Sequence, residues 1–368
     1  MLRIKHFQPG MNVKEYIPCL FPHYSRLYEL SGLQLDVRAI PALSLLSLPT
    51  YSRSEDLLST VVNIWDGRRL GYKGSLTQLG IGQEKKEAAS FEQGMELLKH
   101  NITTGMLMLV CGSMYQLPYS NEYKNLNVYP HPYLGLTEHW LSLYGVSGQE
   151  VLVYDPIPNH YQGSLALHHF KEFWEGDRFV PELSDYPGIH HLSVYGYYEL
   201  ELYRKVTDEE MKSLMFKAFQ TVTYEYVSGR VIEDHGISYY FGRSAVAQLL
   251  EDLASLSKGE AQPAAIIEYE KHIVSSKYSR YFFRDLLEAM SPFGAPFTHY
   301  LNTFLDIIKD WDMVSNLYVL YLKRSRSSFD FLEKIVTLLQ ELSRKESAFF
   351  EKLYMNHQGE RLMDKIII

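Results

Sequence analysis

The sequence predicts an α+β fold in which a mixed N-terminal domain precedes an all-helical C-terminal domain. Short β-branched and aromatic runs, separated by glycine and proline turn signals, occupy much of the first 204 residues. From Thr207 onward, segment after segment shows helical periodicity instead. Thr207 and Glu210 have the spacing of a helix capping box at this change. We therefore expect two domains, at residues 1–204 and 205–368.

A β-hairpin is the central prediction for the first domain. Two apolar arms, HWLSLY and VLVYD, flank a turn signal at Ser147 and Gly148. Pro156 cannot donate to a sheet ladder, so the second strand should end at Asp155. Folding the arms together places His139 beside Asp155, to within one residue of register. A carboxylate in that position fixes the tautomer of the imidazole and stabilises the imidazolium.

Such a histidine suggests a nucleophile for it to activate, and Cys19 is the stronger of two candidates. Apolar residues from Leu20 onward lie at helical spacing, and Pro22 is tolerated only in a first turn, so a helix should begin close to Cys19. A thiol there lies at the positive end of the helix dipole, which favours the thiolate. The alternative for Cys19 is a small buried residue. Cys111, at the end of a predicted strand over 106–110, has no base or dipole nearby in sequence.

Composition narrows the possible functions. The formal net charge is -8, which argues against nucleic acid as a general partner. Two cysteines make neither a disulfide framework nor a zinc site, and no histidine pair has metal-ligand spacing, so we expect no metal. The start of the chain lacks the apolar region of a signal peptide, and no run of about eighteen apolar residues occurs. We expect a cytoplasmic protein without a membrane-spanning segment.

Other elements follow from the same patterns. Strands are expected at 60–65 and 195–203, and helices at 90–100 and 165–173. In the second half, the expected helices cover residues 208–227, 243–257, 265–276, 279–290, 298–309, 311–323 and 327–354. The helical domain has two open roles: to form one wall of the site, or to pair with a second copy in a homodimer.

Three features in order carry a family resemblance. They are a cysteine opening an early helix, a strand followed by the aromatic loop YQLPY, and the hairpin that runs from His139 to Asp155. Together they resemble the butirosin biosynthesis protein H (BtrH) family, whose N-terminal domain is similar to papain-like, C39-type cysteine peptidases. The helical second half resembles the appended helical region of that family, chiefly at 236–253 and 279–289.

The resemblance implies an acyltransferase of secondary-metabolite, including antibiotic, biosynthesis. In that family, a cysteine takes an acyl or aminoacyl group from the phosphopantetheine thioester of an acyl carrier protein and passes it to a small-molecule amine. By matching position, Cys19 would be the nucleophile, His139 the base and Asp155 the residue that orients the base. The protein itself would need no cofactor, because the partner carries the phosphopantetheine.

Further site residues are candidates on weaker grounds. Papain-like enzymes usually have a glutamine or asparagine that binds the oxyanion a few residues before the cysteine, and here the only such residue is Asn12, seven residues ahead. Backbone N–H groups at the start of the Cys19 helix could also hold an oxyanion. Tyr115 and Tyr119 of the aromatic loop, with His131 in the long segment after it, are candidates for contacts with substrate.

Two other functions stay open at this stage. A cysteine hydrolase (a peptidase, amidase or thioesterase) would use the same three residues with water as the acceptor. A binding or scaffold protein on an inactive papain-like fold would keep the hairpin as structure only. Product analysis separates transfer from hydrolysis, and the reactivity of Cys19 separates both from the scaffold.

Overall fold

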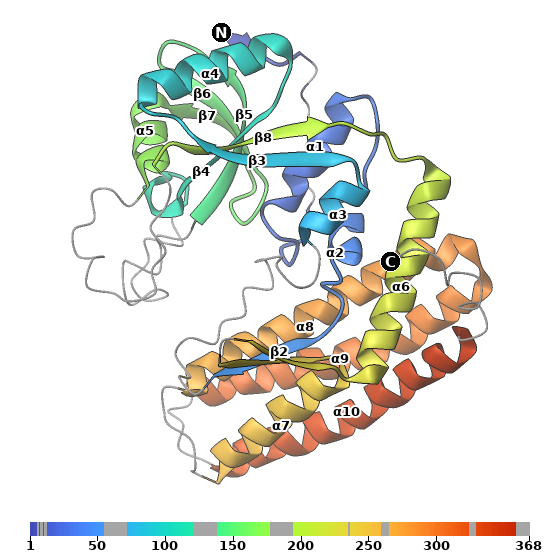
Figure 1. The fold of residues 1–368 in the computed structure, drawn as a ribbon. Coiled ribbons are helices and arrows are strands. Elements are labelled where there is room, and N and C mark those ends of the chain that lie inside the picture. The colour runs from blue at the N-terminus through green and yellow to red at the C-terminus, as the bar shows by residue number, and fades with distance from the viewer. Residues whose placement is uncertain are drawn as a thin grey trace. The chain divides into compact units, whose positions relative to one another are not determined.

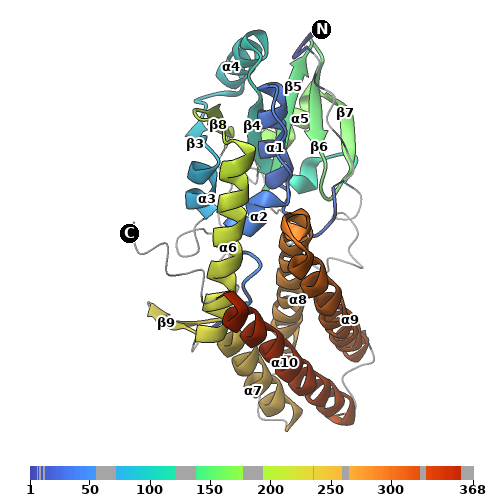
Figure 2. The same ribbon diagram turned by 90° about the vertical axis from the view of Figure 1, so that its right-hand side faces the viewer.

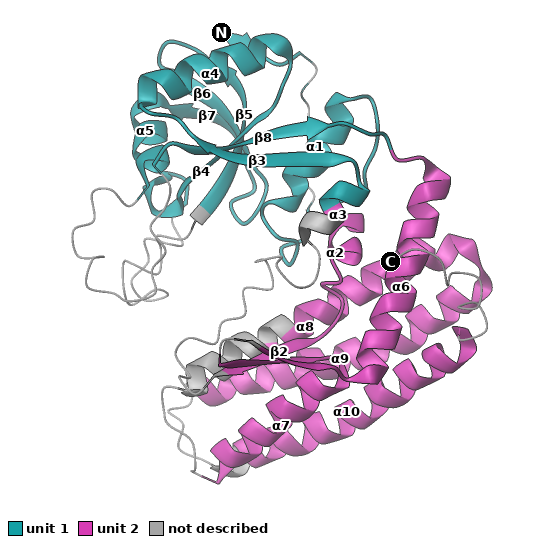
Figure 3. Ribbon diagram, in the orientation of Figure 1, with its two compact units in different colours: residues 1–37, 76–205 teal, residues 38–75, 206–368 magenta. Residues whose placement is uncertain are grey.

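The computed structural model describes residues 1–5, 7, 10, 13–54, 72–120, 138–176, 194–234, 236–258, 265–323 and 329–357. It divides into two compact units (Figure 3). Unit 1 comprises residues 1–37 and 76–205, and unit 2 comprises residues 38–75 and 206–368. The chain is α+β, with an antiparallel sheet and helices in unit 1 and a helical region in unit 2. Residues 38–75 join the helical unit rather than continuing the first one.

Unit 1 is built on one seven-stranded antiparallel sheet (Figure 1). Along the sheet the order is β3-β8-β4-β5-β6-β7, and β1 pairs with β5. The strands are β1 (Leu2–Arg3), β3 (Ile81–Glu87), β4 (Met108–Ser113), β5 (Glu138–Val146), β6 (Glu150–Asp155), β7 (Tyr161–Ala166) and β8 (Gly196–Leu202). The predicted hairpin is β5 and β6, in the interior of this sheet.

The hairpin has a different register from the one that the sequence suggested. At its turn the Ser147 N–H donates to the Glu150 carbonyl at 2.8 Å, and the Ser147 Oγ accepts from the Glu150 N–H at 3.1 Å. These two residues therefore pair, and the loop lies one residue later than expected. A register shift follows between Leu143 and Gly145. Ser142 then pairs with Tyr154, so continuing the ladder by one residue would place Asp155 opposite Leu141. His139 is two residues away, on the same face as Asp155 by strand alternation, and diagonal positions of this kind are within reach of long side chains.

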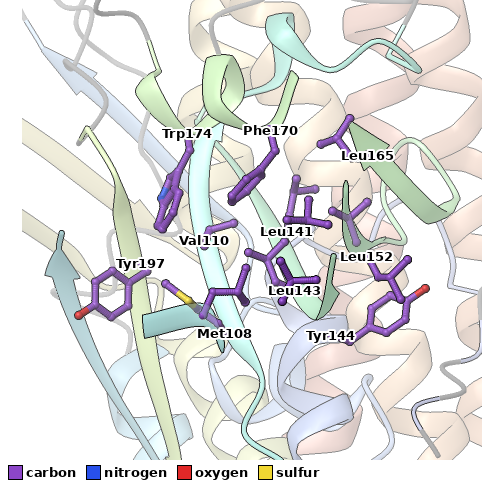
Figure 4. Packing of buried hydrophobic residues seen from close by; sticks show 14 of the residues in the cluster. Met108, Val110, Leu141, Leu143, Tyr144, Leu152, Leu165, Phe170, Trp174 and Tyr197 are labelled. Carbon is purple, nitrogen blue, oxygen red and sulfur yellow. The ribbon is translucent and has the colours of Figure 1, made fainter. Parts of the chain in front are cut away.

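The helices of unit 1 are α1 (Phe21–Leu30), α3 (Tyr72–Gln78, which crosses from unit 2), α4 (Phe91–Thr104), the 3₁₀ turn η3 (Met114–Gln116) and α5 (Leu167–Glu175). Buried residues of α4, η3 and α5 pack with the sheet in one apolar core (Figure 4). Phe170 and Trp174 of α5 pack with Leu141 and Val110 of the sheet. Gly112, which pairs with His139, has no Cβ, and one would lie 2.1 Å from the Phe173 carbonyl oxygen. This glycine therefore allows α5 to approach β4 closely.

Several local predictions in unit 1 are confirmed. Pro22 lies in the first turn of α1, and Ser90 caps α4 by accepting from the Gln93 N–H. The expected helix at 165–173 was placed two residues early, because β7 continues to Ala166 before α5 begins. The expected strand at 60–65 lies outside the described residues.

Unit 2 is dominated by long helices that pack along one another (Figure 2). They are α2 (Ala39–Leu43), α6 (Asp208–Ser228), α7 (Arg243–Ser257), α8 (Ala265–Met290), the short η7 (Ser291–Phe293), α9 (Ala295–Lys323) and α10 (Phe329–His357). The capping box of Thr207 and Glu210 is present at the start of α6. Within the described ranges, no helix is both long and apolar enough to cross a membrane.

Two details of unit 2 correct the prediction. The expected breaks near 277 and 310 are absent, so four expected helices form the two continuous helices α8 and α9. Neither place has a glycine or proline to interrupt the backbone ladder. The unit is also not purely helical, because it contains a three-stranded sheet of order β2-β10-β9. Its strands are β2 (Thr50–Ser54), β9 (Val231–Asp234) and β10 (Ile237–Phe241).

Candidate active site

Three segments of unit 1 bring Cys19, His139 and Asp155 together. Cys19 lies two residues before α1 and is partly exposed. His139 is the second residue of β5, and Asp155 is the last residue of β6. The side chains of His139 and Asp155 are 1% and 0% exposed, so the cysteine is the member of the group that solvent can reach.

The Asp155 carboxylate receives three hydrogen bonds. The Nε2 atom of His139 lies 2.8 Å from Oδ1. On the other oxygen, the Tyr119 hydroxyl donates at 3.1 Å and the Asn159 side-chain amide donates at 2.8 Å. Donors on both oxygens hold the carboxylate in one orientation and stabilise its negative charge. With Nε2 bonded to Asp155, Nδ1 is the ring nitrogen left for the Cys19 sulfur.

The electrostatics of His139 favour the imidazolium. Burial opposes a charge on the ring, but the Asp155 carboxylate outweighs it through its charge and its hydrogen bond. A hydrogen bond with Cys19 and the charge of its thiolate act in the same direction. Together they raise the pKa of His139 to about 10. A thiol beside an imidazole that binds its proton this firmly is the arrangement of an activated cysteine nucleophile.

Helix α1 positions Cys19 through its first turn. Leu20 is the N-cap residue, and the Phe21 N–H donates to the Pro18 carbonyl at 2.9 Å. This turn fixes the backbone on both sides of Cys19. The residue precedes the helix by the short distance that the sequence led us to expect, and it lies near the positive end of the helix dipole.

A second histidine, His23, is the third residue of α1 and was not singled out from the sequence. It is fully buried, and its Nδ1 atom is 2.6 Å from the Ser142 hydroxyl of β5. Its ring also packs edge-on against Tyr154, with the ring centroids 5.6 Å apart. Burial, followed by the charge of nearby His139, lowers the pKa of His23 to about 3. His23 is therefore neutral and does not compete with His139 for a proton.

The remaining sequence candidates have varied positions. Tyr119, expected to contact substrate, donates its hydroxyl to Asp155, and its ring stacks on Tyr161 with centroids 3.9 Å apart. Tyr115 lies in η3 and is partly buried. Cys111 is fully buried in β4, where it pairs with Trp140. The candidates Asn12 and His131 lie outside the described residues.

Sequence reasoning did not identify Asn159, His23 or Ser142 as parts of this site. Two weak signals could have drawn attention to them. Asn159 is an amide four residues after Asp155, and His23 follows Cys19 by the i, i+4 spacing that places side chains on one face of a helix. Ser142 gave no signal, because a serine inside a strand is unremarkable until its partner is known.

The wider context adds little to the identification. Among the residues that the structure describes, no group of three or more histidine, cysteine, aspartate and glutamate side chains could hold a metal ion. Comparison with protein-family models finds no match, and comparison with curated proteins finds no significant match. The interpretation of the site therefore depends on its geometry and on the resemblance described above.

Proposed function

We propose that this protein is a cysteine acyltransferase on a papain-like fold, with Cys19 as nucleophile, His139 as acid and base, and Asp155 as the residue that orients His139. The observation that carries the proposal is the group of three residues itself. A partly exposed thiol lies beside a buried histidine whose partner is a buried, fully hydrogen-bonded carboxylate. A histidine–carboxylate pair that served only the stability of the fold would not require a thiol at its solvent-facing end.

The chemistry proceeds in two balanced steps. The Cys19 thiolate attacks the carbonyl carbon of a thioester, the bond to the donor sulfur breaks, and His139 gives its proton to the departing thiolate. An amine then attacks the acyl-cysteine, His139 accepts the proton released from the amine nitrogen, and the Cys19 thiolate departs. The products are an amide and the regenerated enzyme. Asp155 keeps His139 in the tautomer that both steps require.

The donor and acceptor classes come from the family resemblance. A thioester on the phosphopantetheine arm of an acyl carrier protein would be the donor, and a small-molecule amine of a biosynthetic pathway would be the acceptor. The proposed chemistry agrees with this donor, because exchange between a thiolate and a thioester replaces one carbon–sulfur bond with another.

The deciding experiment is intact mass spectrometry after brief incubation with acylated pantetheine. The wild-type chain should gain the mass of one acyl group, and the Cys19→Ala variant should gain none. Cys111→Ala is the matched control, because it removes the other cysteine of the chain, which is buried, and should leave the adduct in place. An adduct that persists in Cys19→Ala would contradict the assignment of the nucleophile.

The fate of the adduct then separates the two enzyme classes. Addition of a panel of primary amines should discharge the acyl-enzyme to amides faster than water discharges it to the free acid. Free acid as the sole product, at every amine concentration, would favour a cysteine hydrolase with the same residues. If no thioester of a panel acylates the chain, and iodoacetamide also alkylates Cys19 slowly, the result would favour a binding protein.

A further inference from the structure

Two of the contacts between the Cys19 segment and strand β5 concern the proposed site. The first is the contact between Cys19 and His139. The second is the hydrogen bond of 2.6 Å between His23 and Ser142, which is buried on both sides. His23 follows Cys19 by four positions and is the third residue of α1. On the strand, Ser142 follows His139 by three residues, about 10 Å. Both contacts therefore join the same two segments within a short distance.

We propose that the hydrogen bond between His23 and Ser142 positions the nucleophile against its base, which makes these two residues positioning residues of the proposed acyl-transfer site. This inference rests on the proposed function. Both side chains are fully buried, so neither can exchange its partner for water. A buried polar pair specifies one arrangement, because sliding α1 along β5 would break this hydrogen bond.

The electrostatic state of His23 fits this role. The ring is buried against Tyr154 and is neutral near pH 7, so it adds no positive charge beside the imidazolium of His139. A lysine or arginine at this position would instead repel that imidazolium. His23 touches neither the thiol nor the carboxylate in any contact that the structure gives, so its effect would be exerted through the position of α1.

The test compares Ser142→Ala with Tyr24→Phe. The Tyr24 hydroxyl donates to the Gln83 side chain of β3, so Tyr24→Phe removes a hydrogen bond between the same helix and a different part of the sheet. The readout is the rate at which iodoacetamide alkylates Cys19 at pH 6, where ordinary thiols are almost wholly protonated, with Cys19→Ala as the blank. We expect Ser142→Ala to be about five- to tenfold slower than wild type, and Tyr24→Phe to match wild type.

Ser142→Thr and Ser142→Val keep the test decisive if Ser142→Ala does not fold. The two replacements have nearly the same volume, and only threonine retains the hydroxyl. Alkylation at the wild-type rate in the threonine variant and slow alkylation in the valine variant would support the inference. Equal rates for the two, or equal losses in Ser142→Ala and Tyr24→Phe, would overturn it while leaving the nucleophile assignment intact. If wild-type Cys19 reacts no faster than in the urea-unfolded chain, the proposed function fails, and this inference fails with it.

Discussion

Two buried charged clusters, one in each unit, differ in what they leave accessible. In unit 1, Asp155 accepts from His139, Tyr119 and Asn159, and the partly exposed Cys19 adjoins them. In unit 2, Glu346 and Arg280 form a two-pronged ion pair, with Nε to Oε1 at 2.7 Å and Nη2 to Oε2 at 2.5 Å. Both clusters are almost fully buried, so burial of charge alone does not distinguish a candidate active site.

In the cluster of unit 2, the charged groups are occupied by partners within the protein. The remaining Arg280 nitrogen, Nη1, donates to the Ser276 carbonyl and the Ser279 hydroxyl, and the guanidinium lies 4.1 Å from the centre of the Trp311 ring. The Tyr226 hydroxyl donates to Glu346. Arginine does not titrate near neutral pH, and the cluster has no nucleophile. The Arg280 side chain is 1% exposed.

The comparison shows that a candidate active site is distinguished by a solvent-accessible side chain and by a side chain that can change its protonation state. The cluster of unit 1 combines an imidazole, which can give and take a proton, with a thiol, which can form a covalent bond, whereas the cluster around Arg280 and Glu346 has no nucleophile. We therefore expect substitutions in the first cluster to affect reactivity more than folding. Substitutions in the second cluster should affect folding alone.

The largest expected effect on reactivity is that of Asp155→Asn. Tyr119 and Asn159 both donate at the Oδ2 position, so the new amide should turn its oxygen toward them and its NH₂ group toward His139. His139 Nε2 would then have to accept, which would place the ring proton on Nδ1, facing Cys19. We expect acylation of Cys19 by acylated pantetheine to fall about 10²- to 10⁴-fold.

Asp252→Asn is the matched control for this substitution. Asp252 is also buried, and it accepts from the Tyr51 hydroxyl at 2.5 Å in unit 2, whose sequence contains no cysteine. Its replacement should leave the acylation rate per folded molecule unchanged. If both variants lose reactivity equally, the role of Asp155 is structural, and the contrast between the two clusters fails.

The second cluster should give the largest effect on stability. Glu346→Ala leaves the Arg280 guanidinium buried without its counter-charge, so we expect the free energy of unfolding to fall by about 3–5 kcal/mol. Urea denaturation measures this change. Replacing both residues, as Arg280→Met with Glu346→Leu, should recover most of the loss, because no buried charge then remains unpaired. Alkylation of Cys19 per folded molecule should stay at the wild-type level in each variant.

The pH dependence of stability should distinguish the clusters in a third way. The pKa of His139 is raised to about 10 in the folded protein, from about 6.5 in an unfolded chain. The resulting stabilisation is therefore complete below about pH 6.5 and is lost as the pH rises toward 10. We expect the free energy of unfolding to fall by a few kcal/mol over this interval in the wild type, and by less in His139→Gln. Equal slopes for the two proteins would contradict the assignment of the imidazolium.

The parts of the site that could be predicted from the sequence are those that depend on residues close together in the chain. Alternating apolar residues and a turn signal located the hairpin, and Pro22 located the start of α1. The offset of His139 from Asp155 was wrong because the Ser147 turn and the register shift at Leu143–Gly145 together move the pairing. Neither a side-chain-closed turn nor a bulge has a unique sequence signature.

Long-range pairs were out of reach of the sequence for a different reason. His23 and Ser142 are 119 positions apart, and Tyr119 and Asp155 are 36 apart, so their contacts depend on how elements pack rather than on any local pattern. The same limitation applies to Arg280, whose partner Glu346 lies 66 positions away. In each case the residue types are visible in the sequence, and only packing determines their partners.

The smallest of these effects, and the most specific test of the first cluster, is that of Tyr119→Phe. The substitution removes one of three hydrogen bonds to Asp155 and keeps the ring that stacks on Tyr161. Because Asn159 still donates to the same oxygen, we expect acylation to fall only about tenfold and the pKa of His139, followed by NMR, to shift measurably.

Tyr195→Phe is the control, since the Tyr195 hydroxyl donates to the buried Glu175 carboxylate at 2.6 Å outside the site. Loss of stability should be similar in the two variants, so a drop in acylation confined to Tyr119→Phe would show that this hydroxyl acts on Asp155 in catalysis. An unchanged rate would mean that Asn159 alone suffices to hold Asp155.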